Sequence, residues 1–152
     1  MSDFTVVIPA RHGSQRLPGK PLLEIVGRPM IQHVFERARE SGAADVVIAT
    51  DDPRIRDAVG RFTDRVCMTS TEHASGTDRI AEVVATLDWP DDTVVVNLQG
   101  DEPLMPPELL SQVAKTLLAH EHSEMATLAV ALTEPEQLFD PSVVKVVTDR
   151  QG

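Results

Sequence analysis

The chain has 152 residues, 41% of them hydrophobic and 3% aromatic, and its formal net charge at pH 7 is −10. This length allows one globular domain, whose core must be built mainly from Val, Leu, Ile and Ala because aromatic residues are so few. An acidic field of this size excludes a general nucleic-acid or anionic-membrane surface, since such partners are held by many cations, but a small anion in one local pocket stays compatible with it.

Dense apolar segments predict six β-strands. In chain order they cover residues 4–9, 45–50, 65–69, 93–98, 125–132 and 143–148. Their apolar residues run together rather than alternate with polar ones, which is typical of strands buried on both faces of a parallel sheet.

Segments with helical periodicity separate or follow these strands. They cover residues 28–42, 51–62, 75–89 and 106–120. In the first of them, Met30, Val34 and Ala38 share one face, and Pro29 suits the first turn. Strands alternating with helices predict an α/β fold with a three-layer αβα arrangement and a doubly wound, mostly parallel sheet. In such sheets ligands bind at the carboxyl ends of the strands.

The two ends of the chain and its cysteine give further expectations. The first residues contain an apolar run too short for a signal peptide or a membrane span, so we expect a cytoplasmic protein. The single cysteine, Cys67, excludes a disulfide framework and a thiolate metal cluster. The last predicted strand runs into the turn signal DRQG with no strand after it, so we expect the front part of a longer protein.

A cationic loop, residues 11–20, follows the first predicted strand. It carries Arg11, Arg16 and Lys20 and contains Gly13 and Gly19, which allow a close approach of the backbone. Its spacing is not that of a P-loop, and no G-x-G-x-x-G motif occurs in the chain. Surface cations are often merely solvated. However, guanidinium forks and an ammonium group at the ligand edge of a sheet suit a triphosphate with magnesium.

Two further motifs lie where strands or helices begin or end. Gln99 and Asp101 follow the fourth strand. The segment that contains them is typical either of an ordinary turn or of a site where a carboxylate binds magnesium. Ser75 or Thr77 is a candidate N-cap, with Asp78 in the first helical turn. Such a helix start can also hold a polar ligand. The histidines show no metal-binding spacing, and only His73 lies near a motif.

Five blocks in order carry a resemblance to a known family. They are VVIPARHGSQRLPGKPL, PMIQHV, VVIATDD, CMTSTEHASGTDR and VVNLQGDEPL. Together they resemble 3-deoxy-manno-octulosonate cytidylyltransferase, the CMP-Kdo synthetase family of Gram-negative bacteria. The resemblance covers essentially the whole chain and implies a nucleotide-diphospho-sugar transferase-like fold. It further implies that residues 1–152 are the nucleotide-binding part of a single α/β catalytic domain, cut before its C-terminal part.

The resemblance also implies an activity. A nucleotidyltransferase of this family converts CTP and 3-deoxy-manno-octulosonate (Kdo) into CMP-Kdo and pyrophosphate for lipopolysaccharide biosynthesis. The resemblance implies that the anomeric hydroxyl attacks the α-phosphorus in line. Mg²⁺ held by the protein would stabilise phosphate oxygens and, in a two-metal arrangement, would lower the pKa of that hydroxyl. The full-length protein is expected to be a homodimer, with no nucleic-acid or membrane partner.

Particular residues take roles through this resemblance. The expected catalytic residues are Arg11, Arg16, Lys20 and Asp101, with Asp101 as the magnesium ligand. A second metal-binding aspartate would come from a later part of the protein. The expected nucleotide pocket consists of Ala10, Arg11, Ser75, Gly76, Thr77, Asp78 and Arg79, with Gln99 toward the sugar acid.

Two alternative functions stay open, and a third is disfavoured. A CMP-sialic acid synthetase-like activity on another sugar acid would use a similar first loop. A nucleotide-binding fragment without turnover would follow if the later carboxylate and sugar site are needed. A hydride-transferring dehydrogenase is disfavoured because the glycine fingerprint is missing and cations stand where that fold needs bare backbone.

Overall fold

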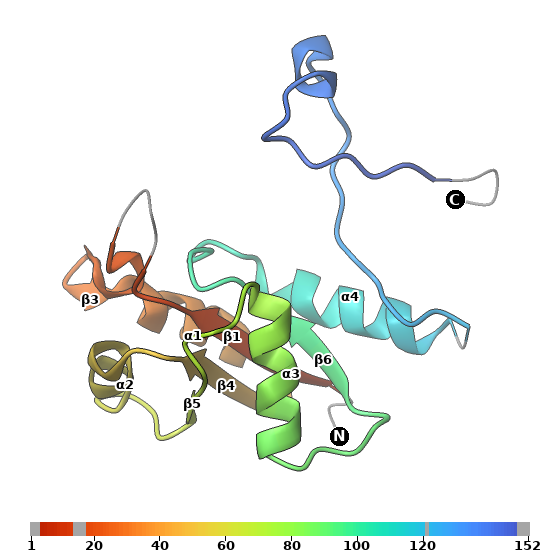
Figure 1. Cartoon of the computed structure of the whole chain (residues 1–152). Helices are drawn as coiled ribbons and strands as arrows, with labels where there is room; N and C mark the ends of the chain where they lie inside the picture. The colour runs from red at the N-terminus through yellow and green to blue at the C-terminus, as the bar shows by residue number, and fades with distance from the viewer. Residues whose placement is uncertain (1–3, 14–17, 121, 149–152) are drawn as a thin grey trace.

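A four-stranded parallel sheet forms the centre of the protein. The computed structural model describes residues 4–13, 18–120 and 122–148. The strands are β1 (Phe4–Ala10), β4 (Asp45–Thr50), β5 (Val66–Met68) and β6 (Val94–Asn97), in the order β5-β4-β1-β6 (Figure 1). In the register, Val6 of β1 stands beside Val46 on one side and Val96 on the other. These strands correspond to the first four predicted ones.

The connections wind the sheet in both directions from β1. Helix α1 (Met30–Glu40) leads from β1 to β4, and α2 (Pro53–Val59) leads on to β5. Helix α3 (Gly76–Thr86) then crosses back to β6 on the other side of β1, and α4 (Pro107–Leu118) follows. The order reverses between β1 and β6, which is where an open sheet of this kind opens a ligand crevice.

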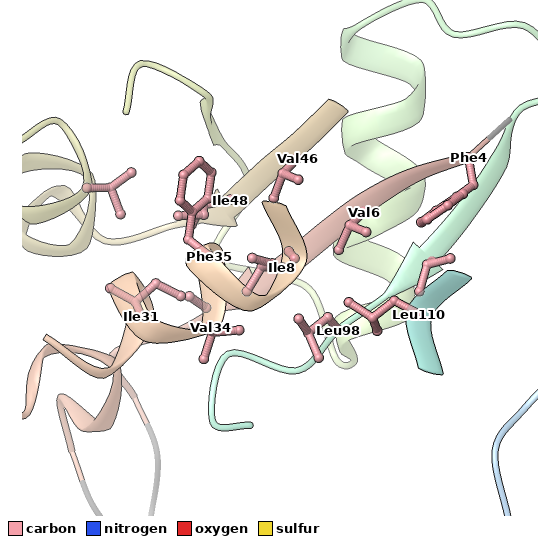
Figure 2. Close-up of a cluster of buried hydrophobic side chains, with 14 of the residues drawn as sticks. Phe4, Val6, Ile8, Ile31, Val34, Phe35, Val46, Ile48, Leu98 and Leu110 are labelled. Carbon is pink, nitrogen blue, oxygen red and sulfur yellow. The ribbon is translucent and has the colours of Figure 1, made fainter. Parts of the chain in front are cut away.

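Helices cover both faces of the sheet, so the three-layer, doubly wound prediction is confirmed. Side chains of α1, α2 and α4 pack with Val6 and Ile8 of β1 on one face (Figure 2). Val7 points to the other face and packs with Ile80 and Val83 of α3. Because both faces are covered, every residue of β1 is buried. Each fully buried Val or Ile contributes about 1.5–3 kcal/mol.

Two helices begin with a side-chain cap, and the cap at Ser75 is one of the two predicted candidates. Asp52 caps α2 by accepting a hydrogen bond from the Arg54 amide at 2.8 Å, and Ser75 caps α3. Both caps satisfy backbone N–H groups that have no partner inside the helix. Of the helices in the described ranges, none has the length and apolar character needed to cross a bilayer.

A short hairpin between β1 and α1 was not predicted. It consists of β2 (Glu24–Ile25) and β3 (Arg28–Pro29), which pair antiparallel. The two turn residues, Val26 and Gly27, have φ values of 50° and 75°. Such turns usually carry Asn-Gly or Asp-Gly, so a valine in the left-handed region hides the signal in the sequence.

The predicted strands at 125–132 and 143–148 are wrong for the described residues. This part of the chain contains only a 3-10 helix, η2 (Pro135–Leu138), and it extends away from the α/β body (Figure 1). Val130 and Val147 are 91% and 90% exposed. Their apolar pattern suits a buried strand, but a strand also needs a hydrogen-bonded neighbour, and the described residues supply none here.

Candidate active site

A pocket lies at the carboxyl edge of the sheet, where the ends of β1 and β6 meet the start of α3. Its volume is about 90 Å³. It is lined by Pro9, Ala10, Arg11, His73, Ser75, Gly76, Arg79 and Gln99. Three chain segments that were predicted separately to bind ligand therefore meet where the strand order reverses, between β1 and β6.

The cationic loop and the predicted magnesium ligand face each other beside this pocket. Lys20 begins a 3-10 helix, η1 (Lys20–Leu22), after Gly19 with φ of 70°, and Asp101 follows β6. The Lys20 Nζ atom lies 2.7 Å from Asp101 Oδ2. The two side chains are 34% and 50% exposed. Because an ion pair this exposed contributes little to stability, a ligand can separate it at small cost.

Close packing against the end of β1 explains two glycines of the site. A Cβ atom on Gly100 would lie 2.9 Å from the Pro9 carbonyl oxygen. One on Gly76 would lie 3.3 Å from Cγ of Pro9. The turn after β6 and the start of α3 are thus both brought against β1, which draws the pocket walls together.

The start of α3 is fixed by a capping box. Ser75 Oγ accepts a hydrogen bond from the Asp78 amide at 3.1 Å and donates one to Asp78 Oδ2 at 2.7 Å. The Ser75 amide also donates to that carboxylate, at 3.1 Å. The predicted cap is confirmed. Thr77 is exposed, and neither Thr77 nor Asp78 is part of the pocket lining, so their nucleotide contacts stay predictions.

Arg79 is buried in the wall of the pocket. Its Nη2 donates to Asp51 Oδ2 at 2.6 Å, while Nη1 donates to the Thr69 hydroxyl and, at 3.3 Å, to the Ser70 carbonyl. Sequence reasoning placed Arg79 near the nucleotide but missed Asp51. The available signal was a carboxylate directly after the carboxyl end of a predicted strand.

His73 and Glu82 form a second contact between α3 and the loop before it. Nε2 of His73 contacts the Glu82 carboxylate, which also accepts a hydrogen bond from the Ser70 amide at 2.9 Å. The hydrogen bond with His73 is the largest cause, and that with Ser70 the next, of a lowered pKa for Glu82. His73 lines the pocket, although its sequence context gave only a weak indication of a role there.

The carboxylates after β6 can supply part of a magnesium site. Mg²⁺ takes hard oxygen ligands, often one or two carboxylates together with phosphate oxygens and water. Asp101 offers one half-exposed carboxylate, and burial, together with the charge of Asp101, raises the pKa of its neighbour Glu102. The described residues contain no cluster of three or more His, Cys, Asp or Glu side chains arranged to hold a metal. Asp101 can therefore supply one Mg²⁺ ligand, and the other ligands would have to come from outside the described residues, for example from phosphate oxygens and water.

A family assignment follows from comparison with known proteins. The family model described as cytidylyltransferase matches residues 5–152. The chain belongs to the cytidylyltransferase family. The match begins in β1 and includes every segment that builds the pocket.

The chain is similar in sequence to relatives from two bacteria. The chain is 60% identical over 150 residues to a 3-deoxy-manno-octulosonate cytidylyltransferase of Idiomarina loihiensis. The alignment covers 99% of the chain and 59% of that protein. It is 58% identical over 150 residues to the enzyme of the same name from Vibrio vulnificus, again covering 99% and 59%. The chain thus spans about 59% of the length of these relatives.

A solved structure agrees with the fold. The structure of CMP:2-keto-3-deoxy-manno-octonic acid synthetase complexed with CTP superposes with a TM-score of 0.73 and 48% sequence identity. The superposition covers 80% of this chain and 49% of the other. The predicted similarity to CMP-Kdo synthetase and the predicted α/β class are both confirmed.

The described residues include most of those predicted for the site. Ala10, Arg11, Ser75, Gly76, Arg79 and Gln99 line the pocket. Lys20 and Asp101 pair at its side. Arg16 lies outside the described residues. Pro9 and His73 also line the pocket, and the sequence indicated them weakly or not at all.

Proposed function

We propose that this chain provides the nucleotide site of a 3-deoxy-manno-octulosonate cytidylyltransferase. The reaction joins CTP to the sugar acid and gives CMP-Kdo and pyrophosphate. The observation that carries the proposal is the Lys20–Asp101 pair at 2.7 Å beside the pocket between β1, β6 and α3. The 58–60% identity to enzymes named for this reaction and the likeness to a synthetase complexed with CTP support it.

Different residues at the sheet edge bind different parts of the substrates. Arg11 and Lys20, with Arg16 of the same cationic loop, hold the triphosphate and offset its charge. Ala10, Ser75 and Gly76 bound the pocket for the nucleoside, and backbone groups at the start of α3 supply polar contacts. Gln99, whose Nε2 donates to Asn97 Oδ1 at 3.0 Å, faces the incoming sugar acid.

Transfer of the nucleotidyl group demands positioning rather than covalent help from the protein. The anomeric hydroxyl of the sugar attacks the α-phosphorus, the bond to the β-phosphate oxygen breaks, and pyrophosphate leaves. The cations keep the triphosphate in line and stabilise charge that develops on the leaving group. A Mg²⁺ ion held by Asp101 would supply Lewis-acid stabilisation of the phosphate oxygens.

A coupled pyrophosphate assay tests this function. The protein is incubated with CTP, Mg²⁺ and, in separate reactions, Kdo or a sialic acid. Release of pyrophosphate with Kdo and little with sialic acid is the expected result. Release only with sialic acid would favour the related sugar-acid activity. Binding of CTP without release from any acid would show nucleotide binding alone and would contradict turnover by this chain.

A further inference from the structure

Asp51 lies at the carboxyl end of β4, outside the pocket lining, yet it pairs with a residue that belongs to that lining. Its Oδ2 accepts a hydrogen bond from Arg79 Nη2 at 2.6 Å. The side chains of Arg79 and Asp51 are 4% and 16% exposed. The pair therefore connects the end of a core strand to the wall of the pocket in a largely dry environment.

The same guanidinium group also fixes the loop between β5 and α3. Arg79 Nη1 donates to the hydroxyl of Thr69 and to the carbonyl of Ser70. Glu82 of α3 also holds this loop: its carboxylate accepts a hydrogen bond from the Ser70 amide and contacts His73. Two side chains of α3, one cationic and one anionic, thus fasten both the backbone and His73 of this loop.

Breaking the pair would leave a buried cation without its counterion. A buried guanidinium that loses its carboxylate is costly, because water cannot replace the lost partner. Arg79 would then leave its position or draw Thr69 and Ser70 with it, and the pocket wall would lose its shape. A wall held in place before the ligand arrives saves the entropy of ordering it on binding.

We propose that Asp51 is a positioning residue for the nucleoside part of the substrate, acting through Arg79 on the loop 69–75. The charge of Arg79 is offset by Asp51, so Arg79 shapes the pocket while Arg11 and Lys20 act on the triphosphate. This inference rests on the proposed function, and it separates two parts of the site. Asp51 governs binding of the nucleoside, whereas the cationic loop governs binding of the phosphates.

The test compares CTP with inorganic tripolyphosphate, each with Mg²⁺, by titration calorimetry. In Asp51→Asn, we expect the affinity for CTP to fall about tenfold, the scale of one lost charge-assisted hydrogen bond. The affinity for tripolyphosphate should stay within about twofold on the same scale. Asp51→Glu keeps the charge and should recover most of the CTP affinity. A general loss of stability would weaken both ligands alike and would overturn the proposal.

A matched control lies at the other end of the same strand. Asp45 pairs with Arg65 where β4 begins, far along the strand from the pocket, and Asp45 Oδ1 accepts from Arg65 Nε at 3.0 Å. Asp45→Asn should change neither affinity. Equal effects of Asp45→Asn and Asp51→Asn on CTP binding would overturn the role assigned to Asp51.

Amide hydrogen exchange tests the effect of Asp51 on the loop without any ligand. Asp51→Asn should speed exchange in residues 69–76 more than in β1, and unchanged exchange in that loop would contradict the proposal. If the parent protein binds no CTP, the proposed function fails, while the exchange result still decides whether Asp51 fixes the loop. If Asp51→Asn does not fold, Asp51→Glu is compared with the parent protein. It should keep most of the affinity for both ligands, and an equal loss for CTP and tripolyphosphate would overturn the proposal.

Discussion

The ammonium group of Lys20 lies 2.7 Å from the carboxylate of Asp101, although the two residues are 81 positions apart in the chain. They meet because β1 and β6 are parallel neighbours and the two residues follow the carboxyl ends of these strands. The cation proposed for the triphosphate and the carboxylate proposed for Mg²⁺ are thus already held at one place.

Asp101→Ala is expected to lower turnover in the cytidylyltransferase reaction by about 10²–10³-fold, the scale for losing one transition-state contact. The side chain is half exposed, so its removal should leave the fold intact and the circular dichroism spectrum unchanged. Asp92→Ala is the matched control, because this exposed carboxylate precedes β6 at the opposite end of the same strand. A near-normal rate in Asp101→Ala would refute its assigned role.

Lys20→Met is expected to weaken binding of tripolyphosphate with Mg²⁺ by about tenfold, since one charge-assisted contact is lost. Its free energy of unfolding should change by less than about 1 kcal/mol, because the pair with Asp101 is exposed. Calorimetric titration and urea unfolding measure the two effects. Lys115→Met, on α4, changes the net charge equally and should leave binding unaltered. Equal binding losses in both variants would point to net charge alone.

The sequence predicted the parts of the fold that local patterns determine. Dense apolar runs predicted the first four strands, and the candidate cap at Ser75 predicted the start of α3. The rule that ligands bind at the carboxyl ends of strands predicted that Asp101 and the cationic loop lie at the same edge of the sheet. That inference needed only the order of strands and helices.

Other features depend on partners that a local pattern does not reveal. Asp51 and Arg79 are 28 positions apart, and their pairing requires β4 and α3 to be placed in space. The segments at 125–132 and 143–148 have the composition of strands, but an apolar run forms a strand only beside a hydrogen-bonded neighbour. The Val26–Gly27 turn was missed because valine is unusual at positive φ.

Gly100→Ala is expected to destabilise the protein by about 1–3 kcal/mol, the usual cost of overpacking. The added Cβ would lie 2.9 Å from the Pro9 carbonyl oxygen, and a backbone atom of a buried strand has little freedom to move. Urea unfolding measures the change. Gly13→Ala is the control, because a Cβ there meets none of the described residues within 4 Å. Equal stability of the two variants would contradict the packing argument.

Stability in acid should depend on the cap of α2. Hydrogen bonding from the Arg54 side chain is the main cause that lowers the pKa of Asp52 from 3.8 to about 2. Because the folded-state pKa is the lower one, the stabilisation is fully present above pH 3.8 and is lost as the pH falls toward 2. Asp52→Ala should therefore cost about 1 kcal/mol at pH 7, the typical value for an N-cap, and much less at pH 2. Thermal unfolding at both pH values measures this difference. Asp57→Ala, at an exposed ion pair on the same helix, is the control at pH 7, where it should cost less than Asp52→Ala. An unchanged cost for Asp52→Ala at pH 2 would mean that its charge does not support the helix.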